Sequence, residues 1–359
     1  MRGAVLHSLG DTLEVRDDLE LDGLGPGEVR IRIAASGVCH SDLSLMDGTL
    51  PHPLPCVPGH EGAGTVVAVG AGVTDLAEGD HVIISWVPPC GRCATCLGGQ
   101  PNLCTALGLG SMPAPHLKLA DQMVFAGIGT ATFAEETVVS ASAAIKIPDD
   151  VPFDVASLIG CGVMTGVGAA INTAKVRPGS SVVVIGCGGV GINVIQGAKI
   201  AGAADIVAVD LVDKKLDWAR QFGATHAVSP DKLSATMAEL TGGLGADYAF
   251  EVIGRPETIR SAWDATRRGG TTVVVGAGRM DAQVSFSAFE LFYSEKALLG
   301  SVYGSADVRT DFHRLLRLWR SGQLDLEGLI SRRSGIDGIN EAFDAMKKGE
   351  VIRTVIELA

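Results

Sequence analysis

The stretch that decides the fold of one half of the chain is Val182-Val183-Val184-Ile185-Gly186-Cys187-Gly188-Gly189-Val190-Gly191. Four β-branched residues run into a Gly-x-Gly-x-x-Gly turn, and the turn leads into a segment, residues 192–201, that can form a helix. A strand, a glycine-rich turn and a helix in this order are typical of a dinucleotide-binding unit, because the glycines let a pyrophosphate approach the helix N-terminus. The chain holds 47 glycines, so a turn that merely packs a helix on a sheet is the alternative.

The residue that follows the next apolar run favours one cofactor over another. Ile206–Val209 ends in Asp210, about 20 residues beyond the turn, where a dinucleotide fingerprint carries an acid. A carboxylate accepts hydrogen bonds from ribose hydroxyls and repels a 2′-phosphate, which favours NAD over NADP. The residues predicted from this pattern to bind the cofactor are Gly186, Gly188, Gly189, Gly191 and Asp210.

The rest of the chain divides into two kinds of pattern. After about residue 161, apolar runs alternate with helix-length segments, which predicts an α/β domain with a doubly wound parallel sheet. These runs are Val182–Ile185, Ile206–Val209, Ala249–Val252 and Thr272–Val275. Between Val29 and Val87, short β-like runs alternate with Gly, Pro and Asp turns, which indicates a mostly β domain. A final strand, Val351–Leu358, is expected to join that first domain.

Composition excludes several classes of function. The net charge of −12 argues against a nucleic-acid partner, since binding to phosphates needs a basic surface. Two uncharged stretches, 155–174 and 179–198, approach the length of a membrane span, but glycines interrupt both, so we expect core elements and no membrane partner. Residues 1–10 lack the basic and apolar parts of a secretory leader, so a cytoplasmic protein is expected.

Eight cysteines in such a chain indicate metal binding before disulfides, because the cytosol keeps thiols reduced. Four of them lie within fifteen positions, with gaps of two, two and seven residues: Cys90, Cys93, Cys96 and Cys104. Tetrahedral Zn²⁺ takes four thiolates at such spacings, which predicts a structural zinc site. An iron–sulfur cluster, whose compact motif closes with three intervening residues, and free thiols or disulfides are the alternatives.

Three further motifs supply Cys, His and Cys at wide separation: Cys39-His40-Ser41-Asp42, Gly59-His60-Glu61-Gly62 and Gly160-Cys161-Gly162. Taken singly, each is more typical of a buried cysteine or a satisfied polar pair. With the cysteine lobe, the glycine-rich turn and the closing Arg353-Thr354, they place the chain beside a known family. Over essentially its whole length it resembles the zinc-dependent medium-chain alcohol dehydrogenases.

This resemblance implies an architecture of two domains. Residues 161–302 would form a Rossmann domain, a doubly wound parallel sheet that binds NAD. Residues 1–160 and 303–359 would form a mostly β, GroES-like catalytic domain with the zinc sites. The active site would lie in the cleft between them, which is expected to close around NAD.

The resemblance also implies catalytic roles. The three protein ligands of a catalytic zinc ion would be Cys39, His60 and Cys161, which makes two zinc ions per chain. Zinc would lower the pKa of the alcohol, and a hydride would pass to the nicotinamide. Ser41 would take the alcohol proton, Asp42 would orient His60, and Glu61 would lie behind the metal. Where many members end this proton relay at a histidine, the chain has Ser44, so the terminal base is left open.

Five further residues match cofactor contacts of the family. His40 and Arg353 match pyrophosphate contacts, and Lys215 matches a lysine at the adenine ribose. Thr165 and Val190 match positions against the nicotinamide. For Lys215 and Arg353, a solvated surface charge is the alternative.

The substrate is expected to be a small primary alcohol or aldehyde, aliphatic or aromatic. Trp86 falls where the family places an aromatic wall of the pocket, and apolar surface would come from Leu50, Val275, Ala277 and Val302. A neighbouring branch oxidises glutathione adducts of formaldehyde. The acidic residue which that branch carries near Leu50 is missing here, which disfavours glutathione but leaves other thiol adducts open.

The long segment 104–133 resembles a loop of the longer, dimeric members, which favours a homodimer over a tetramer; a plain surface loop is the alternative. Two other functions compete with an NAD-dependent alcohol dehydrogenase. One is an NAD-dependent dehydrogenase of formaldehyde–thiol adducts, and the other is a catalytically silent zinc- or nucleotide-binding scaffold. Retention of all of Cys39, Ser41, His60 and Cys161 favours an enzyme.

Overall fold

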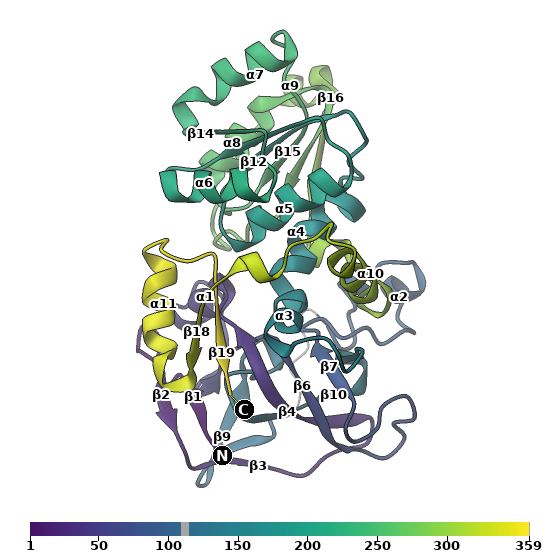
Figure 1. Cartoon of the computed structure of the whole chain (residues 1–359), viewed down its shortest axis with the longest axis vertical. Coiled ribbons are helices and arrows are strands. Elements are labelled where there is room, and N and C mark those ends of the chain that lie inside the picture. The colour runs from purple at the N-terminus through teal and green to yellow at the C-terminus, as the bar shows by residue number, and fades with distance from the viewer. Residues whose placement is uncertain (109–114, 359) are drawn as a thin grey trace. The chain divides into compact units, whose positions relative to one another are not determined.

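The computed structural model describes residues 1–108 and 115–358, and the chain separates into two units (Figure 1). Unit 1 contains residues 1–162, 307–319 and 325–359, and unit 2 contains residues 163–306 and 320–324. Cys161 and Gly162 therefore belong to the first unit, whereas the resemblance placed the start of the Rossmann domain at residue 161. The part of the predicted dimer-type loop at 109–114 lies outside the described residues.

The largest sheet of unit 1 is built on one long strand with alternating burial. In β4 (Glu28–Gly37), Val29, Ile31 and Ile33 are buried and Arg30 and Arg32 turn outward, the period of two expected of a half-buried antiparallel strand. In the described part of the chain the strand order is β11-β7-β6-β4-β19-β18, and β10 also pairs with β4. The remaining strands are β6 (Glu61–Val69), β7 (His81–Ile84), β10 (Glu136–Ser140), β11 (Ala144–Lys146), β18 (Ile330–Gly335) and β19 (Arg353–Glu357).

Two smaller sheets complete the mostly β unit. One pairs β1 (Gly3–Val5) with β2 (Glu14–Arg16), and the other has the order β3-β8-β9-β5, with strands Leu19–Leu21, Leu117–Leu119, Gln122–Ala126 and Cys56–Val57. The hairpin of β8 and β9 lies within the segment 104–133, so the described part of that segment is not a plain loop. The helices of this unit are α1 (His40–Met46), α2 (Ala94–Leu97), α3 (Phe153–Leu158), α10 (Val308–Arg320) and α11 (Ile339–Lys347).

Unit 2 contains a parallel sheet with the predicted run Val182–Ile185 among its central strands. All residues of β12 (Ser181–Ile185) are buried, as expected of a strand covered on both faces. The strand order is β14-β13-β12-β15-β16-β17, and all five pairs are parallel. The other strands are β13 (Asp205–Val209), β14 (His226–Val228), β15 (Ala246–Glu251), β16 (Thr266–Val274) and β17 (Ala297–Gly300).

Helices connect these strands, as a doubly wound sheet requires. They are α5 (Gly189–Ile200), α6 (Asp213–Phe222), α7 (Leu233–Thr241), α8 (Pro256–Ala265) and α9 (Ala288–Ser294). Helix α5 begins three residues earlier than the predicted segment 192–201, because the second half of the glycine-rich turn is already helical. The parallel sheet in unit 2 and the mostly antiparallel sheets in unit 1, where only the pairs β18–β19 and β5–β9 among the described strands are parallel, confirm the predicted fold class.

The helical stretch Phe153–Thr173 joins the two units in the chain. It comprises α3, the π-helical turns η4 (Ile159–Val163) and η5 (Ala169–Thr173), and α4 (Met164–Gly168). By length and composition it could cross a membrane, but 83% of its most apolar window is buried inside the structure. Such burial is typical of a core helix.

Candidate active site and metal centres

A capped helix positions the first predicted zinc ligand. Cys39 is the N-cap of α1, and Asp42 accepts a hydrogen bond from the Cys39 amide at 3.4 Å. The other carboxylate oxygen of Asp42 accepts hydrogen bonds from the Gly59 amide (2.9 Å) and from Nδ1 of His60 (3.0 Å). Asp42 is fully buried, so this one carboxylate ties together the two segments that carry Cys39 and His60.

The three motifs are far apart in the sequence, but the fold brings their side chains together. Ligand atoms of Cys39, His60, Glu61 and Cys161 all lie within 4.8 Å of one another, and all four residues are buried. Cys161 reaches this cluster from the π-helical turn η4, an irregularity that is common at functional sites. We call these four residues the buried cluster.

The groups of the buried cluster shift one another's pKa values. A hydrogen bond from the Cys161 thiol, with the positive charges of His60 and Arg353, holds the pKa of Cys39 well below its usual value. The same hydrogen bond, together with burial, raises the pKa of Cys161. Burial disfavours a protonated His60, but the charges of Asp42 and Cys39 outweigh it and raise its pKa. Cys39 is therefore the anionic donor of the buried cluster, with the cationic groups of His60 and Arg353 beside it.

The donor set fits zinc. Two thiols and one imidazole are ligands that Zn²⁺ takes in proteins, and a catalytic site leaves a further position open. Nε2 of His60 is buried and has no hydrogen-bond partner within residues 1–108 and 115–358, while Nδ1 donates to Asp42. A histidine held in this way by a carboxylate presents its other nitrogen to a metal.

Arg353 forms a buried ion pair with Glu61 of the buried cluster. Nη2 of Arg353 lies 3.4 Å from Glu61, and Nη1 donates to the carbonyl oxygen of Val38 at 3.3 Å. The same Glu61 oxygen accepts a hydrogen bond from the Gly162 amide at 3.0 Å. Burial raises the pKa of Glu61 to about 7, against the opposing charge of Arg353. Arg353 is 5% exposed, so the alternative of a solvated surface charge is wrong for this residue.

Glycine is required where this ion pair meets the backbone. A Cβ at Gly162 would overlap the guanidinium of Arg353, and a Cβ at Gly37 would overlap the carboxylate of Glu61. These two positions explain part of the high glycine content without reference to flexibility.

The other predicted residues of unit 1 lie around the buried cluster at different depths. Ser41 is half-buried, and its hydroxyl lies 3.9 Å from the Cys39 sulfur. The ring of Trp86 stands edge-on to that of His60, with centroids 6.4 Å apart. His40 is exposed. Leu50 lies on a loop and is 41% exposed, and its own amide donates a hydrogen bond to the Ser44 carbonyl oxygen. The structure thus brings Ser41 and Trp86 to the cluster and leaves His40 and Leu50 at the surface of unit 1.

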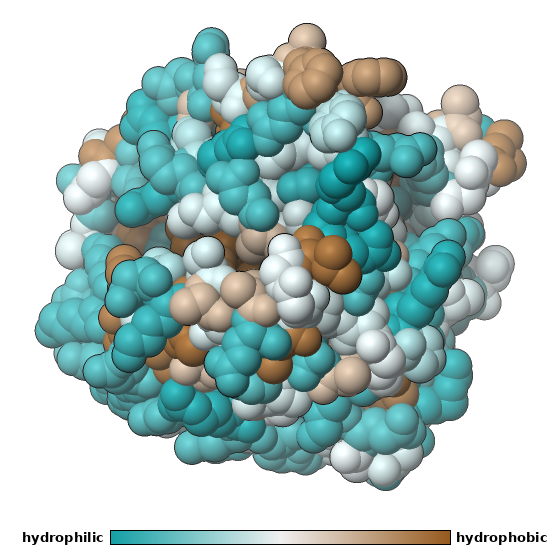
Figure 2. All heavy atoms as spheres, turned by 90° about the horizontal axis from the view of Figure 1, so that it is seen from above, coloured by the Kyte–Doolittle hydropathy of each residue, from teal (hydrophilic) through white to brown (hydrophobic). Residues whose placement is uncertain are grey.

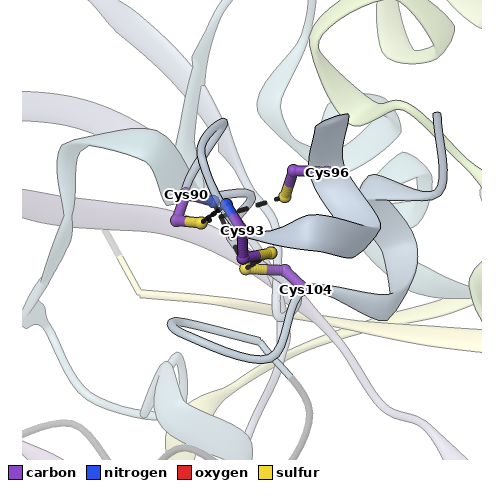
Figure 3. A group of neighbouring side chains, drawn as sticks. All are labelled: Cys90, Cys93, Cys96 and Cys104. Atoms are coloured by element: carbon purple, nitrogen blue, oxygen red, sulfur yellow. Dashed lines mark hydrogen bonds between the residues drawn. The ribbon is translucent and has the colours of Figure 1, made fainter. Parts of the chain in front are cut away.

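The four cysteines of the lobe come together as a second cluster (Figure 3). Their sulfur atoms all lie within 4.8 Å of one another, and Cys96 comes from helix α2. Backbone amides of Arg92 and Cys93 donate to the Cys90 sulfur, and the Cys90 amide donates to the Cys104 sulfur. N–H donors aimed at sulfur stabilise thiolates, which is the form that binds zinc. The donor set fits a closed structural zinc site.

The glycine-rich turn of unit 2 has the shape that a dinucleotide needs. Gly186 has a φ of +98°, and a Cβ at Gly191 would overlap the Gly186 carbonyl oxygen. The carboxylate of Asp210 accepts hydrogen bonds from the amides of Cys187 (2.8 Å) and Val212 (3.1 Å). Asp210 is therefore held beside the turn by backbone groups on both sides.

The remaining predicted residues of unit 2 lie along helices α4 to α6 or just beyond strand ends. Thr165 and Val190 belong to α4 and α5, which pack so closely that a Cβ at Gly166 would overlap the Val190 carbonyl oxygen. Lys215 is half-buried on α6. Val275 and Val302 follow β16 and β17, at the carboxyl edge of the sheet where ligands of such folds bind, and Ala277 is exposed nearby in the chain.

One residue with the same sequence signal as Asp210 was overlooked. Glu251 lies inside the predicted run Ala249–Val252 and is the last residue of β15, where it is fully buried. An acid at the carboxyl end of a buried parallel strand was the signal that could have identified it.

Comparison with known proteins relates both units to oxidoreductases. The family described as "Alcohol dehydrogenase GroES-like domain" matches residues 25–149, and "Zinc-binding dehydrogenase" matches residues 189–321. The chain is 39% identical to an S-(hydroxymethyl)glutathione dehydrogenase of Paracoccus denitrificans, over 99% of each chain. It is 40% identical to an NDMA-dependent alcohol dehydrogenase of Amycolatopsis methanolica, over 99% of this chain and 98% of the relative. The crystal structure of benzyl alcohol dehydrogenase from Acinetobacter calcoaceticus superposes with a TM-score of 0.93 at 34% identity, covering 100% of this chain and 99% of that one.

Proposed function

Because the chain belongs to the zinc-dependent medium-chain alcohol dehydrogenase family, we propose that it transfers hydride between a primary alcohol or aldehyde and NAD. The observation that carries the proposal is the buried cluster, in which Asp42 aims the free nitrogen of His60 at the sulfurs of Cys39 and Cys161. We assign the catalytic chemistry to unit 1, which includes Cys161, and the glycine-rich turn that receives the cofactor to unit 2. The thiols of both clusters fit a reducing cytoplasm.

The residues of the buried cluster divide the chemistry among them. Cys39, His60 and Cys161 would hold a zinc ion, which when bound supplies a Lewis acid for the alcohol oxygen. Ser41, beside Cys39, would take the proton of the alcohol as it releases its own hydroxyl proton into a relay through the ribose. Asp42 keeps Nδ1 of His60 protonated and its ring fixed. Glu61 is paired with Arg353, whose positive charge its carboxylate offsets.

Unit 2 supplies the site that we propose for NAD. The turn from Gly186 to Gly191 leaves room for a pyrophosphate at the N-terminus of α5, where free amides favour an anion. Asp210, already fixed by two amides, offers its carboxylate to ribose hydroxyls and repels a 2′-phosphate. We assign Lys215 to the adenine ribose, Thr165 and Val190 to the nicotinamide, and His40 and Arg353 to the pyrophosphate.

For the substrate we propose a primary alcohol with an aliphatic or aromatic side chain. Trp86 stands against His60 and supplies an aromatic surface next to the reacting oxygen. Leu50, Val275, Ala277 and Val302 are proposed as further apolar contacts. The benzyl alcohol dehydrogenase of similar structure supports an aromatic substrate.

The 39% identity to an S-(hydroxymethyl)glutathione dehydrogenase favours a second candidate, an NAD-dependent dehydrogenase of formaldehyde–thiol adducts. The same zinc and NAD chemistry serves both candidates, so the substrate alone separates them. A catalytically silent scaffold is the alternative of another class. The similarity to an NDMA-dependent enzyme suggests one more feature to test in this chain, a tightly bound NAD that an external acceptor must recycle.

The test is NADH formation at 340 nm with purified protein of known zinc content. Primary, secondary and aromatic alcohols are compared with formaldehyde plus a low-molecular-weight thiol, each with NAD and with NADP, and with an added artificial electron acceptor. We expect turnover of primary alcohols with NAD. Turnover of the thiol adduct alone supports the second candidate, and no turnover under any of these conditions from protein with two zinc ions supports the scaffold.

We further propose that the enzyme is a homodimer that associates through β17 and α9. Strand β17 ends the parallel sheet and has Leu298 and Leu299 41% and 37% exposed, and an unpaired edge of this kind is a template for another strand. Helix α9, just before it, exposes an apolar group consisting of Phe289, Leu291, Phe292 and Tyr293. Figure 2 shows apolar side chains, in brown, that protrude among polar ones on the face seen there. Two copies of one edge strand can pair about a two-fold axis.

A charge on the edge strand should separate the subunits. Leu299→Arg is expected to convert a dimer into a monomer in size-exclusion chromatography with light scattering, because burying a charge in the paired edge is costly. Leu244→Arg is the matched control, since Leu244 is 74% exposed in the loop before β15. A monomeric wild type, or a Leu299→Arg protein that stays dimeric, contradicts this surface.

A further inference from the structure

Glu251 is a buried carboxylate that the proposed chemistry does not use. It lies at the carboxyl end of β15 and is fully buried. One of its oxygens accepts three hydrogen bonds, from the amides of Ile253 (2.9 Å) and Gly254 (2.8 Å) and from the hydroxyl of Thr258 (2.6 Å). Its other oxygen is buried without a hydrogen-bond partner in the described chain. A single oxygen thus holds the loop after β15 and the start of α8.

That loop touches the glycine-rich turn, to which the cofactor is assigned, and the segment 275–278, which carries two of the proposed substrate contacts. A Cβ at Gly186 would lie 2.7 Å from the side chain of Ile253, so Ile253 packs directly on the glycine-rich turn. Gly254, with a φ of +87°, approaches the backbone of Ala277 so closely that a Cβ there would lie 2.6 Å from it. The main-chain oxygen of Glu251 also accepts hydrogen bonds from the amides of Val275 (2.8 Å) and Gly276 (3.1 Å).

We propose that Glu251 is a positioning residue for the dinucleotide, which it reaches through the loop 252–258. By fixing Ile253 and Gly254, it fixes the walls of the glycine-rich turn and of the segment 275–278. Both lie at the carboxyl edge of the parallel sheet, where nucleotides bind in such folds. Glu251 itself makes no contact with the cofactor. The inference rests on the proposed use of NAD.

The variant Glu251→Gln tests this with little change in shape. The amide oxygen can accept the same three hydrogen bonds, but without the charge that strengthens them. The amide nitrogen adds two donors where the second carboxylate oxygen has no hydrogen-bond partner in the described chain. A buried donor without an acceptor costs free energy, so the loop after β15 is expected to shift. We expect the dissociation constant for NAD to rise about tenfold, whereas kcat at saturating NAD changes less than twofold.

The same strand offers a matched control at its other end. Asp247 on β15 also accepts three hydrogen bonds, from the amide and hydroxyl of Ser181 (2.9 and 3.0 Å) and from Arg267 (2.7 Å). It lies four residues from Glu251, about 13 Å along a strand, at the amino edge of the sheet. Asp247→Asn is expected to lower the melting temperature as Glu251→Gln does, but to leave NAD binding within twofold of the wild type.

The experiment titrates NAD into wild type and both variants, with tryptophan fluorescence as the readout, below the melting temperature of each protein. Weaker binding in Glu251→Gln alone supports the inference. Equal weakening in both variants shows a general loss of stability, and unchanged binding in Glu251→Gln shows no role; either result overturns it. A wild type that does not bind NAD overturns both this inference and the proposed function, whereas a wild type that binds leaves the proposed function standing whatever the variants do.

Discussion

Cys39→Ala should reduce NADH formation from a free primary alcohol by about 10³-fold or more. A Lewis-acid metal ion contributes several kcal/mol to the stabilisation of transition-state charge, and each 1.36 kcal/mol corresponds to a tenfold change in rate. Cys39 is both a predicted ligand and the thiol whose low pKa makes it the anion of the buried cluster. Steady-state rates at saturating alcohol and NAD, with the zinc content of each preparation, measure the effect.

Cys56→Ala is the matched control for this loss. Cys56 is another fully buried cysteine of unit 1, but it lies in the apolar core and in neither cysteine cluster. Its replacement by alanine should leave the rate within about twofold of the wild type. A Cys39→Ala protein that retains more than a tenth of the wild-type rate contradicts the assignment of Cys39 to the catalytic metal.

Cys104→Ser should remove the zinc ion of the lobe and destabilise unit 1. Cys104 is buried, and its sulfur accepts a hydrogen bond from the Cys90 amide. The change therefore removes a metal ligand and also disturbs the packing of the lobe. The free energy of metal binding at a structural site adds to the free energy of folding. A loss of 1 kcal/mol lowers the melting temperature of a large domain by about 2–4 °C. We expect the melting temperature to fall by about 10 °C.

Zinc analysis by plasma emission and scanning calorimetry measure this second effect together. Wild type should contain two zinc ions per chain and Cys104→Ser one, with the remaining ion in the buried cluster. A variant that keeps two ions, or one that loses its ion without any change in melting temperature, contradicts a structural role of the lobe. Iron in the wild-type protein instead supports the alternative cluster.

The long-range part of the candidate site could not be derived from spacing. The four cysteines of the lobe could, because their ligand atoms come from one loop, and the turn before α5 could, because strand, glycines and acid adjoin one another. Cys39, His60 and Cys161 meet only through the fold, and their common role came from a resemblance. The burial of Arg353 against Glu61 had no local signal in either segment.

The limits of the fold prediction have similar causes. The central strands β12 and β13 were predicted because they are continuous apolar runs. Strand β14 is only three residues long and half-buried, and β17 reads Ala-Leu-Leu-Gly, which suits a helix as well as a strand. Edge strands such as these two receive their structure from the neighbour they pair with rather than from their own residues.

Anomalous diffraction at the zinc absorption edge tests most directly whether Cys39, His60 and Cys161 hold a metal ion. We predict a peak about 2.3 Å from the sulfurs of Cys39 and Cys161 and about 2.0–2.1 Å from Nε2 of His60, besides a second peak among the four cysteines of the lobe. A zinc-replete crystal with a peak in the lobe and none at the buried cluster would contradict the account.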